Sequence, residues 1–263
     1  MSIPPLESAT VPLHLTTPRE QSLDWRACVG LRGFLGRRMD GVPPSIKQIL
    51  LPFFHEQHDT PAPFRLMLEN SDPISGIHRI RLLTFGRNAV PILNCFIDLL
   101  NSAAGELHLP KHSLPFEVAP IETFEQGSFH LRQDDDILDV ESETTSIVVS
   151  SCSPFFSKTN SGRLFSDGKW SELLAIRYAD LAGVRRKSVL NTMSKISGDS
   201  EYQSKPIQLM LGGDVRTRTG YFFRVRFFQP TFSTIRAIEL LCQLGLGKHT
   251  AYGAGTFRLE MVE

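Results

Sequence analysis

The spacing of hydrophobic residues changes along the chain. Some segments have the two-residue period of strands, and others have the longer period of helices. Glycine and proline residues just after position 40 end the first helical stretch. The order of elements in the first half is β-α-β-β-α-β. The pattern predicts strands at 11–16, 64–69, 78–85 and 116–124, with helices at 25–39 and 89–104.

The second half repeats this order, which indicates a duplicated domain. Each half has the element order of the split βαβ, ferredoxin-like arrangement. We therefore expect an α+β protein made of tandem ferredoxin-like (RRM-like) βαββαβ domains. The pattern predicts strands at 145–151, 206–213, 221–228 and 255–262, with helices at 170–193 and 232–245.

Short sequences also match between the halves. FRLML at 64–68 corresponds to IQLML at 207–211, and Arg79-Ile80-Arg81 corresponds to Arg224-Val225-Arg226. Both matches are in register with the predicted strands, which supports the duplication.

An acidic run, DDDILDVESE, lies at 134–143 between the two predicted halves. A run of like charges is typical of a solvated linker. We therefore expect an N-terminal ferredoxin-like domain at 1–133, the acidic linker at 134–143, and a C-terminal ferredoxin-like domain with a glycine-rich loop at 144–263.

The formal net charge is zero, but the two parts of the chain differ in sign. Residues 1–143 hold 12 Lys and Arg residues against 19 Asp and Glu residues, whereas residues 144–263 hold 16 against 9. The C-terminal half is therefore predicted to face an anion. Arginine outnumbers lysine by 20 to 8, and guanidinium is the better bidentate partner for phosphate, so the composition favours a nucleic-acid ligand.

The composition also limits the class of protein. Hydrophobic residues make up 41% of the chain, yet no stretch approaches the roughly 20 apolar residues of a membrane helix. The first residues lack the charged start and apolar run of a signal peptide. The four cysteines form no Cys-x-x-Cys pair, so neither a zinc site nor a disulfide framework is expected. We expect a soluble cytoplasmic protein with no metal, no cofactor and no membrane partner.

Three stretches carry a family resemblance: LRGFLGRRM at 31–39, MLGGDVRTRTG at 210–220 and GLGKHTAYGAGTF at 245–257. With the tandem pattern, they resemble the CRISPR-associated repeat-cleaving endoribonucleases of the RAMP superfamily. The compact length and the arginine-rich helices are similar to the version found in type IV systems. The resemblance implies metal-independent cleavage of precursor CRISPR RNA. It also implies a repeat stem-loop and other CRISPR effector subunits as partners.

RNA can be cleaved without metal when its ribose 2′-OH attacks the neighbouring phosphate. The reaction needs an aligned attack, a base near the 2′-OH and positive charge at the phosphate. In the family, a histidine in or just after the first helix often acts as the base. Here the next histidine is His55, which is far along the chain and beside acidic residues. Arg38 and Arg32 are the candidate phosphate stabilisers, although arginines at the end of this helix can equally serve its dipole.

The candidate RNA-binding residues belong to three basic segments besides the first helix. The predicted helix at 170–193 could lie along a folded RNA hairpin, or its arginines could form a solvated face. The glycine-rich loop could present backbone N–H groups to phosphates, or its glycines could only shape a turn. The candidates are Arg37, Arg177, Arg185, Arg186, Arg216, Arg218, Gly245, Gly247, Lys248, His249, Gly253 and Gly255.

The predicted strand at 221–228 places two side-chain sets on opposite faces. Tyr221, Phe223, Val225 and Phe227 form the apolar set, which we expect in the core. The other set holds Arg224 and Arg226 between two phenylalanines. It could form a basic, aromatic platform or pack against the neighbouring domain.

Two alternatives to a repeat-cleaving enzyme remain open. The first is a non-catalytic guide-RNA-binding subunit of the same superfamily, which the lack of a histidine in the first helix favours. The second is an unrelated tandem ferredoxin-like protein that binds a small molecule, which the neutral net charge allows.

Overall fold

The computed structural model describes residues 3–54, 61–131, 146–156, 163–191, 193, 196–211, 214–247 and 250–262. Three groups of residues singled out above lie outside this part of the chain. They are the acidic run at 134–143, His55, and the pair Lys248 and His249.

The first half forms a sheet of order β2-β3-β1-β5-β4, in which neighbouring strands are antiparallel. The central strand β1 pairs with β3 along its length, with β6 near its start and with β5 near its end. The elements are β1 (Leu6–Thr16), α1 (Arg26–Arg37), α2 (Pro44–Phe54), β2 (Phe64–Asp72), β3 (Ile77–Phe85), α3 (Ala89–Leu100), β4 (Ala104–His108), β5 (Ser113–Val118) and β6 (Glu125–Phe129).

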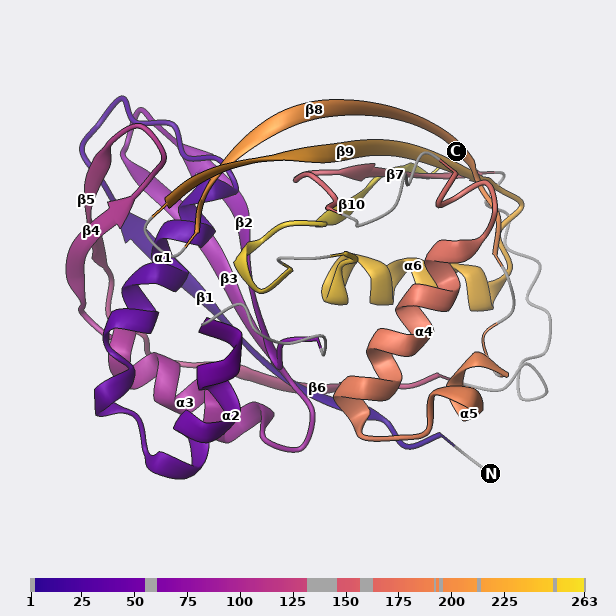
Figure 1. The fold of residues 1–263 in the computed structure, drawn as a ribbon, viewed down its shortest axis with the longest axis horizontal. Helices are drawn as coiled ribbons and strands as arrows, with labels where there is room; N and C mark the ends of the chain where they lie inside the picture. Colours follow the sequence, from indigo (N-terminus) through magenta and orange to yellow (C-terminus); the bar gives the residue numbers. More distant parts are fainter. Residues whose placement is uncertain are drawn as a thin grey trace.

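The second half forms a four-stranded antiparallel sheet of order β10-β7-β9-β8. Strands β8 and β9 are long and form a hairpin that reaches over the first half (Figure 1). The elements are β7 (Ser146–Ser151), α4 (Lys169–Ala182), α5 (Arg186–Leu190), β8 (Asp199–Leu211), β9 (Asp214–Phe228), α6 (Phe232–Leu244), η3 (Thr250–Tyr252) and β10 (Phe257–Val262).

Both sheets confirm the tandem ferredoxin-like α+β fold. In a βαββαβ unit, the first strand lies between the third and the fourth, as β7 lies between β9 and β10. The matched sequences lie on equivalent strands but at opposite ends of them, since FRLML begins β2 and IQLML ends β8. Arg79 and Arg224 likewise lie on the equivalent strands β3 and β9.

Four elements of the first half differ from the prediction. Helix α2 and strands β4 and β6 were not expected, and the strand predicted at 116–124 is β5 at Ser113–Val118. Pro44 occupies the first position of α2, where a missing N–H costs nothing, so it starts a helix here instead of only ending the previous one.

The predicted helix at 170–193 is two helices. Gly183 adopts a left-handed conformation with φ of 67° and ends α4, and α5 begins at Arg186. A glycine with positive φ just past a helix is a common helix terminator. The arginines predicted to share one helix therefore lie on separate elements.

The two hydrophobic cores each contain residues from the other half. Ile207 and Leu209 of β8 are buried in the core of the first half, whereas Leu6 and Phe85 are buried in the core of the second. Tyr178 on α4 adds a polar connection, since its hydroxyl donates toward the carbonyls of Pro4 and Phe129, each at 2.9 Å. The halves are thus packed into one body. None of the helices in the described residues has the length and apolar character needed to span a membrane.

Candidate functional site

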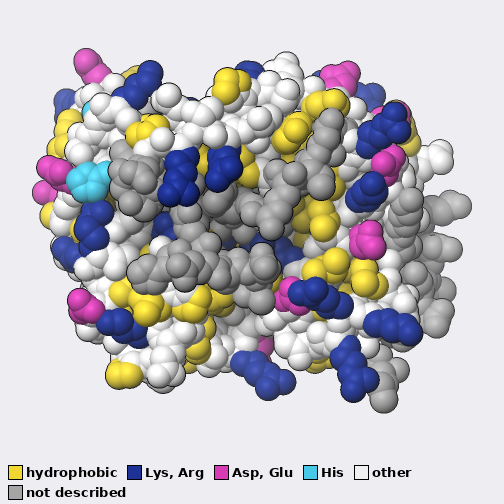
Figure 2. All heavy atoms as spheres, in the orientation of Figure 1, with side chains coloured by type: hydrophobic (Ala, Val, Ile, Leu, Met, Phe, Trp, Pro, Cys, Tyr) yellow, Lys and Arg dark blue, Asp and Glu magenta, His cyan; other side chains and the backbone are white. Residues whose placement is uncertain are grey.

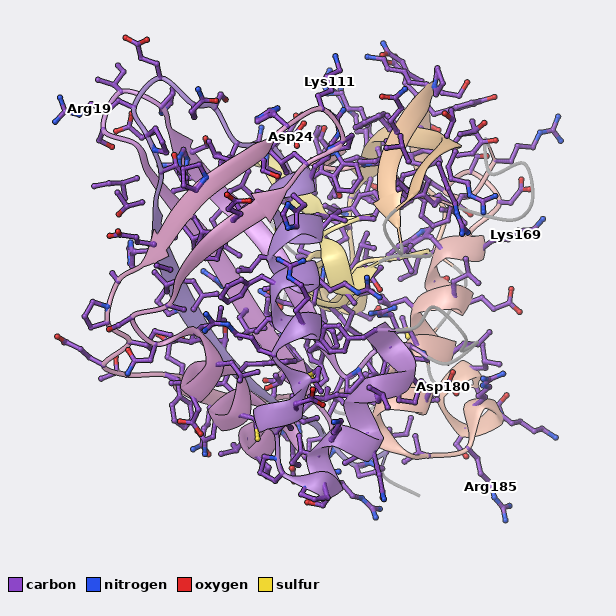
Figure 3. The ribbon with its side chains drawn as sticks, turned by 60° about the vertical axis from the view of Figure 1, so that its left-hand side comes forward. Arg19, Asp24, Lys111, Lys169, Asp180 and Arg185 are labelled. Carbon is purple, nitrogen blue, oxygen red and sulfur yellow. The ribbon has the colours of Figure 1, made fainter. Side chains whose placement is uncertain are left out.

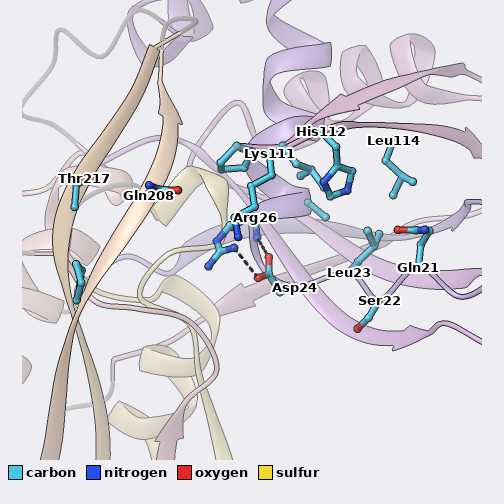
Figure 4. A pocket seen from close by; sticks show the side chains of 14 residues that line it. Gln21, Ser22, Leu23, Asp24, Arg26, Lys111, His112, Leu114, Gln208 and Thr217 are labelled. Atoms are coloured by element: carbon cyan, nitrogen blue, oxygen red, sulfur yellow. Dashed lines mark hydrogen bonds and ion pairs between the residues drawn. The ribbon is translucent and has the colours of Figure 1, made fainter.

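The β8–β9 hairpin meets the start of α1 and the turn between β4 and β5 around a cavity of about 420 Å³ (Figure 4). Lys111 and His112 come from the turn, and Gln208 and Thr217 face each other across the hairpin. Figure 3 shows Lys111 and Asp24 near the same end of α1. The cavity therefore joins polar groups of both halves, which no local sequence pattern could bring together.

Arg26 contributes a partly satisfied guanidinium to this cavity. Its backbone N–H donates to Asp24 Oδ1 at 2.8 Å, and its Nη1 lies 3.5 Å from Asp24 Oδ2. Its buried Nε has no hydrogen-bond partner in the described part of the chain. The cavity offers hydrogen-bond donors with little opposing negative charge, which suits a polar or anionic ligand.

The β8–β9 hairpin carries Arg216 and Arg218 on β9, and both side chains are exposed. They pair across the hairpin with Leu209 and Ile207, whose side chains are buried against the first half. The sequence placed these arginines in a turn. The structure places them on a strand, at the side of the hairpin that faces the first domain.

Of the three arginines predicted to act on RNA from the first helix, one is buried and two are exposed. Arg32 is 6% exposed, its Nη2 donates to the carbonyl of Phe53 at 2.7 Å, and its guanidinium lies 5.4 Å from the ring centre of Phe54. Arg32 thus fastens the end of α2 to α1. These contacts favour a structural role for it over the predicted contact with the scissile phosphate.

Arg37 and Arg38 are exposed at the end of α1. The Arg38 guanidinium lies over the ring of Phe34 at 4.2 Å, and its Nη1 donates to the carbonyl of Leu99 at 3.3 Å. Because Arg38 uses one donor of its fork and stays exposed, the remaining donors are free to meet an anion.

The glycine-rich loop at 245–257 uses most of its glycine N–H groups inside the protein. Gly245 donates to the carbonyl of Leu241 at 2.8 Å, Gly253 to that of Thr250 at 3.1 Å and Gly255 to that of Pro154 at 2.8 Å. The expectation that the loop presents successive N–H groups to phosphates is therefore not met at these three glycines. Their donors are already committed.

The glycines are required because a side chain would meet protein atoms. Each has positive φ, and a Cβ at Gly255 would lie 1.8 Å from the carbonyl oxygen of Leu246. A Cβ at Gly247 would meet the Phe155 ring at 2.6 Å, and one at Gly253 would meet the Leu66 carbonyl at 3.1 Å. The alternative reading, in which the glycines shape the loop, explains these positions.

Arg65 of β2 holds both ends of this loop. It is 0% exposed, and its Nη1 donates to the carbonyls of Gln243 and Cys242 at 2.6 and 3.2 Å. Its Nη2 donates to Thr256 Oγ1 at 2.7 Å and to the carbonyl of Gly255 at 3.3 Å. The first two acceptors are at the C-terminal end of α6, where the helix dipole favours a cation. Sequence reasoning missed Arg65, although an arginine inside the apolar strand FRLML was a visible signal.

The predicted basic helix does not present its arginines together. Arg177 on α4 is 8% exposed, whereas Arg185 is exposed between α4 and α5 and points outward (Figure 3). Arg186 forms a two-point ion pair with Asp180 at 2.7 and 2.8 Å, and this carboxylate raises the pKa of Arg186. These three arginines therefore cannot form one surface that lies along an RNA hairpin.

The two faces of β9 are as expected. Phe223, Val225 and Phe227 are buried in the second core. On the other face Phe228 is 60% exposed, and Arg224 Nε lies 3.1 Å from Glu260 Oε2. This face is open to solvent at Arg224 and Phe228, whereas Phe222 on the same face is partly buried against the core of the first half, so each of the two alternatives applies to part of it.

No protein-family model matches the sequence, and no curated protein matches it either. Solved structures do match along nearly the whole chain. A Thermus thermophilus Cas6 is 15% identical with a TM-score of 0.50, covering 98% of this chain and 100% of its own. A Cas6 product complex is 14% identical with a TM-score of 0.51, covering 97% of this chain and 99% of its own.

The chain has the Cas6 fold. A partial Cas6-RT-Cas1–Cas2 complex matches as well, at 11% identity and a TM-score of 0.50, covering 100% of this chain and 47% of that chain. The tandem fold expected from the resemblance is thereby confirmed.

Within this Cas6 fold, the predicted residues fall into separate places. Arg37 and Arg38 are exposed on α1, Arg216 and Arg218 are exposed on the hairpin, and Arg32 and Arg177 are buried. Figure 2 shows a hollow in the middle of one face, with Lys or Arg side chains visible inside it. The predicted basic residues thus do not form one continuous stripe.

Proposed function

We propose that the protein binds the stem-loop of a CRISPR repeat and cleaves the RNA through metal-independent 2′-OH attack. The observation that carries this proposal is the Cas6 fold over the whole chain. The exposed Arg216 and Arg218 on the β8–β9 hairpin add a basic surface that fits an RNA backbone. Cleavage would leave a 5′-OH and a 2′,3′-cyclic or 3′ phosphate, and the protein would stay bound to its product.

In this mechanism the protein aligns the RNA and stabilises charge at the scissile phosphate. Arg38 is suited to the second task, because the Phe34 ring and the Leu99 carbonyl hold its guanidinium in place while it stays exposed. A guanidinium that is already oriented loses little freedom when it binds a phosphate. His55, the predicted catalytic histidine, and His249, a predicted RNA-binding residue, lie outside the described residues.

A second candidate function is a non-catalytic subunit that binds guide RNA. The structural role of Arg32 favours it, since this arginine is committed to the Phe53 carbonyl. In both cases, other CRISPR proteins would be partners. One structural neighbour was solved in a Cas6-RT-Cas1–Cas2 complex, which supports this proposal for the present chain.

The proposed cleavage should proceed with a labelled repeat RNA in EDTA, since the 2′-OH attack needs no metal. A single 2′-deoxy substitution at the cut site should abolish cleavage and leave the dissociation constant unchanged. Gel analysis of the products and a binding titration on the same RNA provide the measurement. A cut that requires magnesium would contradict the mechanism, and binding without any cut would favour the non-catalytic subunit.

Arg38→Ala should slow single-turnover cleavage about a hundredfold, because it removes positive charge at the scissile phosphate. Binding of the repeat should weaken far less. Arg19→Ala is the control, since Arg19 is exposed and is not among the predicted RNA-binding residues. An equal loss of rate and affinity in Arg38→Ala would make Arg38 a binding residue instead.

A further inference from the structure

The guanidinium of Arg177 on α4 is buried, and part of it makes no hydrogen bond within the described residues. Arg177 is 8% exposed, and its Nε and Nη2 have no hydrogen-bond partner in the described part of the chain. Buried polar groups are normally satisfied, and a buried charge without a partner is costly. A ligand that accepts hydrogen bonds would satisfy these two nitrogens.

A second buried cation makes the position of Arg177 more unfavourable. Burial lowers the pKa of Arg177 to about 9. The positive charge of Arg65 adds a smaller effect in the same direction, and the negative charge of Asp180 acts in the opposite direction. Burial also lowers the pKa of Arg65 to about 10. Asp180 cannot fully compensate the pair, because its two carboxylate oxygens already bind Arg186 at 2.7 and 2.8 Å.

The two arginines differ in how their donors are used. Arg65 donates to the Cys242, Gln243 and Gly255 carbonyls and to the Thr256 hydroxyl. Arg177 donates to none of the described residues. The Nη1 and Nη2 groups of Arg65 are therefore used by the end of α6 and the glycine-rich loop, and only its Nε lacks a partner in the described residues, whereas both Nε and Nη2 of Arg177 are unpartnered there and can serve a ligand.

The position of this pair is between the halves. Arg65 comes from β2 of the first half, and Arg177 comes from α4 of the second. Helices α4 and α6 border the middle of the molecule opposite α1 and α2 (Figure 1). The hollow in Figure 2 lies over this middle region, and basic side chains are visible within it.

We propose that Arg177 binds a phosphate group between the two halves, beside the glycine-rich loop that Arg65 holds. The ligand chemistry is a phosphate oxygen, which accepts charge-assisted hydrogen bonds from a guanidinium. Under the proposed function, on which this assignment of the source rests, the phosphate belongs to the backbone of the bound repeat RNA. Its negative charge would also relieve the repulsion between Arg177 and Arg65.

Arg177→Met gives the sharpest test, because the two possible roles predict opposite changes in stability. Replacing an unpartnered buried charge by an apolar side chain should raise the melting temperature of the free protein. The same change should weaken binding of a repeat RNA hairpin about tenfold to a hundredfold. A structural arginine would instead lower the melting temperature when replaced.

The salt dependence of RNA binding gives a second measurement. Loss of one phosphate contact should reduce the slope of log K against log salt by about 0.7 to 0.9. Arg19→Met is the matched control, since Arg19 is exposed at the outer edge of the first half (Figure 3). Unchanged RNA affinity and slope in Arg177→Met, in a wild type that binds RNA, would overturn the proposal.

Pyrophosphate separates this proposal from the proposed function. At equal ionic strength, pyrophosphate should raise the melting temperature of the wild type more than chloride does, and Arg177→Lys should reduce that gain. If pyrophosphate stabilises the wild type but no repeat RNA binds, the phosphate site stands and the RNA function fails. If pyrophosphate has no effect beyond that of chloride, the site at Arg177 is contradicted, whether or not Arg177→Met folds.

Discussion

Arg65→Met should lower the free energy of unfolding by about 3 kcal/mol or more, the largest effect expected for any single side chain here. The change leaves four acceptors at the ends of the glycine-rich loop without this donor, and the contacts with Gly255 and Thr256 are buried. The change also removes the cation that faces the C-terminal end of α6. Equilibrium denaturation in urea, followed by fluorescence, measures the difference.

A surface arginine on the neighbouring strand provides the control for Arg65→Met. Arg79 on β3 forms an ion pair with Glu69 at 2.8 Å, and its side chain is 48% exposed. Arg79→Met should cost less than about 1 kcal/mol, because exposed ion pairs contribute little. Equal small losses in both variants would mean that the contacts of Arg65 do not hold the loop.

Arg65 and Arg177 are expected to respond in opposite directions, although both are buried arginines of the same region. Arg65 donates to four acceptors, so its removal leaves polar groups unsatisfied. Arg177 donates to none in the described residues, so its removal relieves a desolvated charge. Burial alone therefore does not decide the sign of a substitution; the satisfaction of the donors does.

Gly255→Ala should destabilise the protein by about 3 kcal/mol or more, measured by the same denaturation experiment. Gly255 has a φ of 61°, and an added Cβ would lie 1.8 Å from the carbonyl oxygen of Leu246. Backbone must move to accept the methyl group. Because Gly255 also donates to the Pro154 carbonyl, that movement would break a hydrogen bond of 2.8 Å.

Gly183→Ala separates the steric clash from backbone strain. Gly183 has a φ of 67°, close to that of Gly255, but an added Cβ there would meet nothing within 4 Å. Gly183→Ala should therefore cost only the strain of a left-handed alanine, about 1 kcal/mol. Similar losses in the two variants would show that the close contact at Gly255 can relax.

The order of strands and helices could be predicted because hydrophobic period is a local property. Sequence matches on β2 and β8 were short, yet they marked equivalent strands. The break at Gly183 was harder to predict. An isolated glycine in a helical pattern either is tolerated or ends the helix, and only its left-handed conformation distinguishes the two.

The candidate site could be predicted less well, because its contacts join distant parts of the chain. Arg65 binds residues 177 to 191 positions away. Arg32 and Arg177 were selected for their charge, and sequence alone could not show that both are buried. The glycine-rich loop was predicted from the spacing of its glycines. That spacing could not show which protein atoms an added Cβ would meet, because this depends on how the loop packs.

The shared cores limit how the two copies of the duplicated unit can evolve. Leu209 belongs to the second copy, yet it is buried among residues of the first, and Phe85 has the reverse relation. A mutation at either position must be compatible with both copies at once. The two halves are thus not independent in their packing, and removing either one would expose apolar residues of the other.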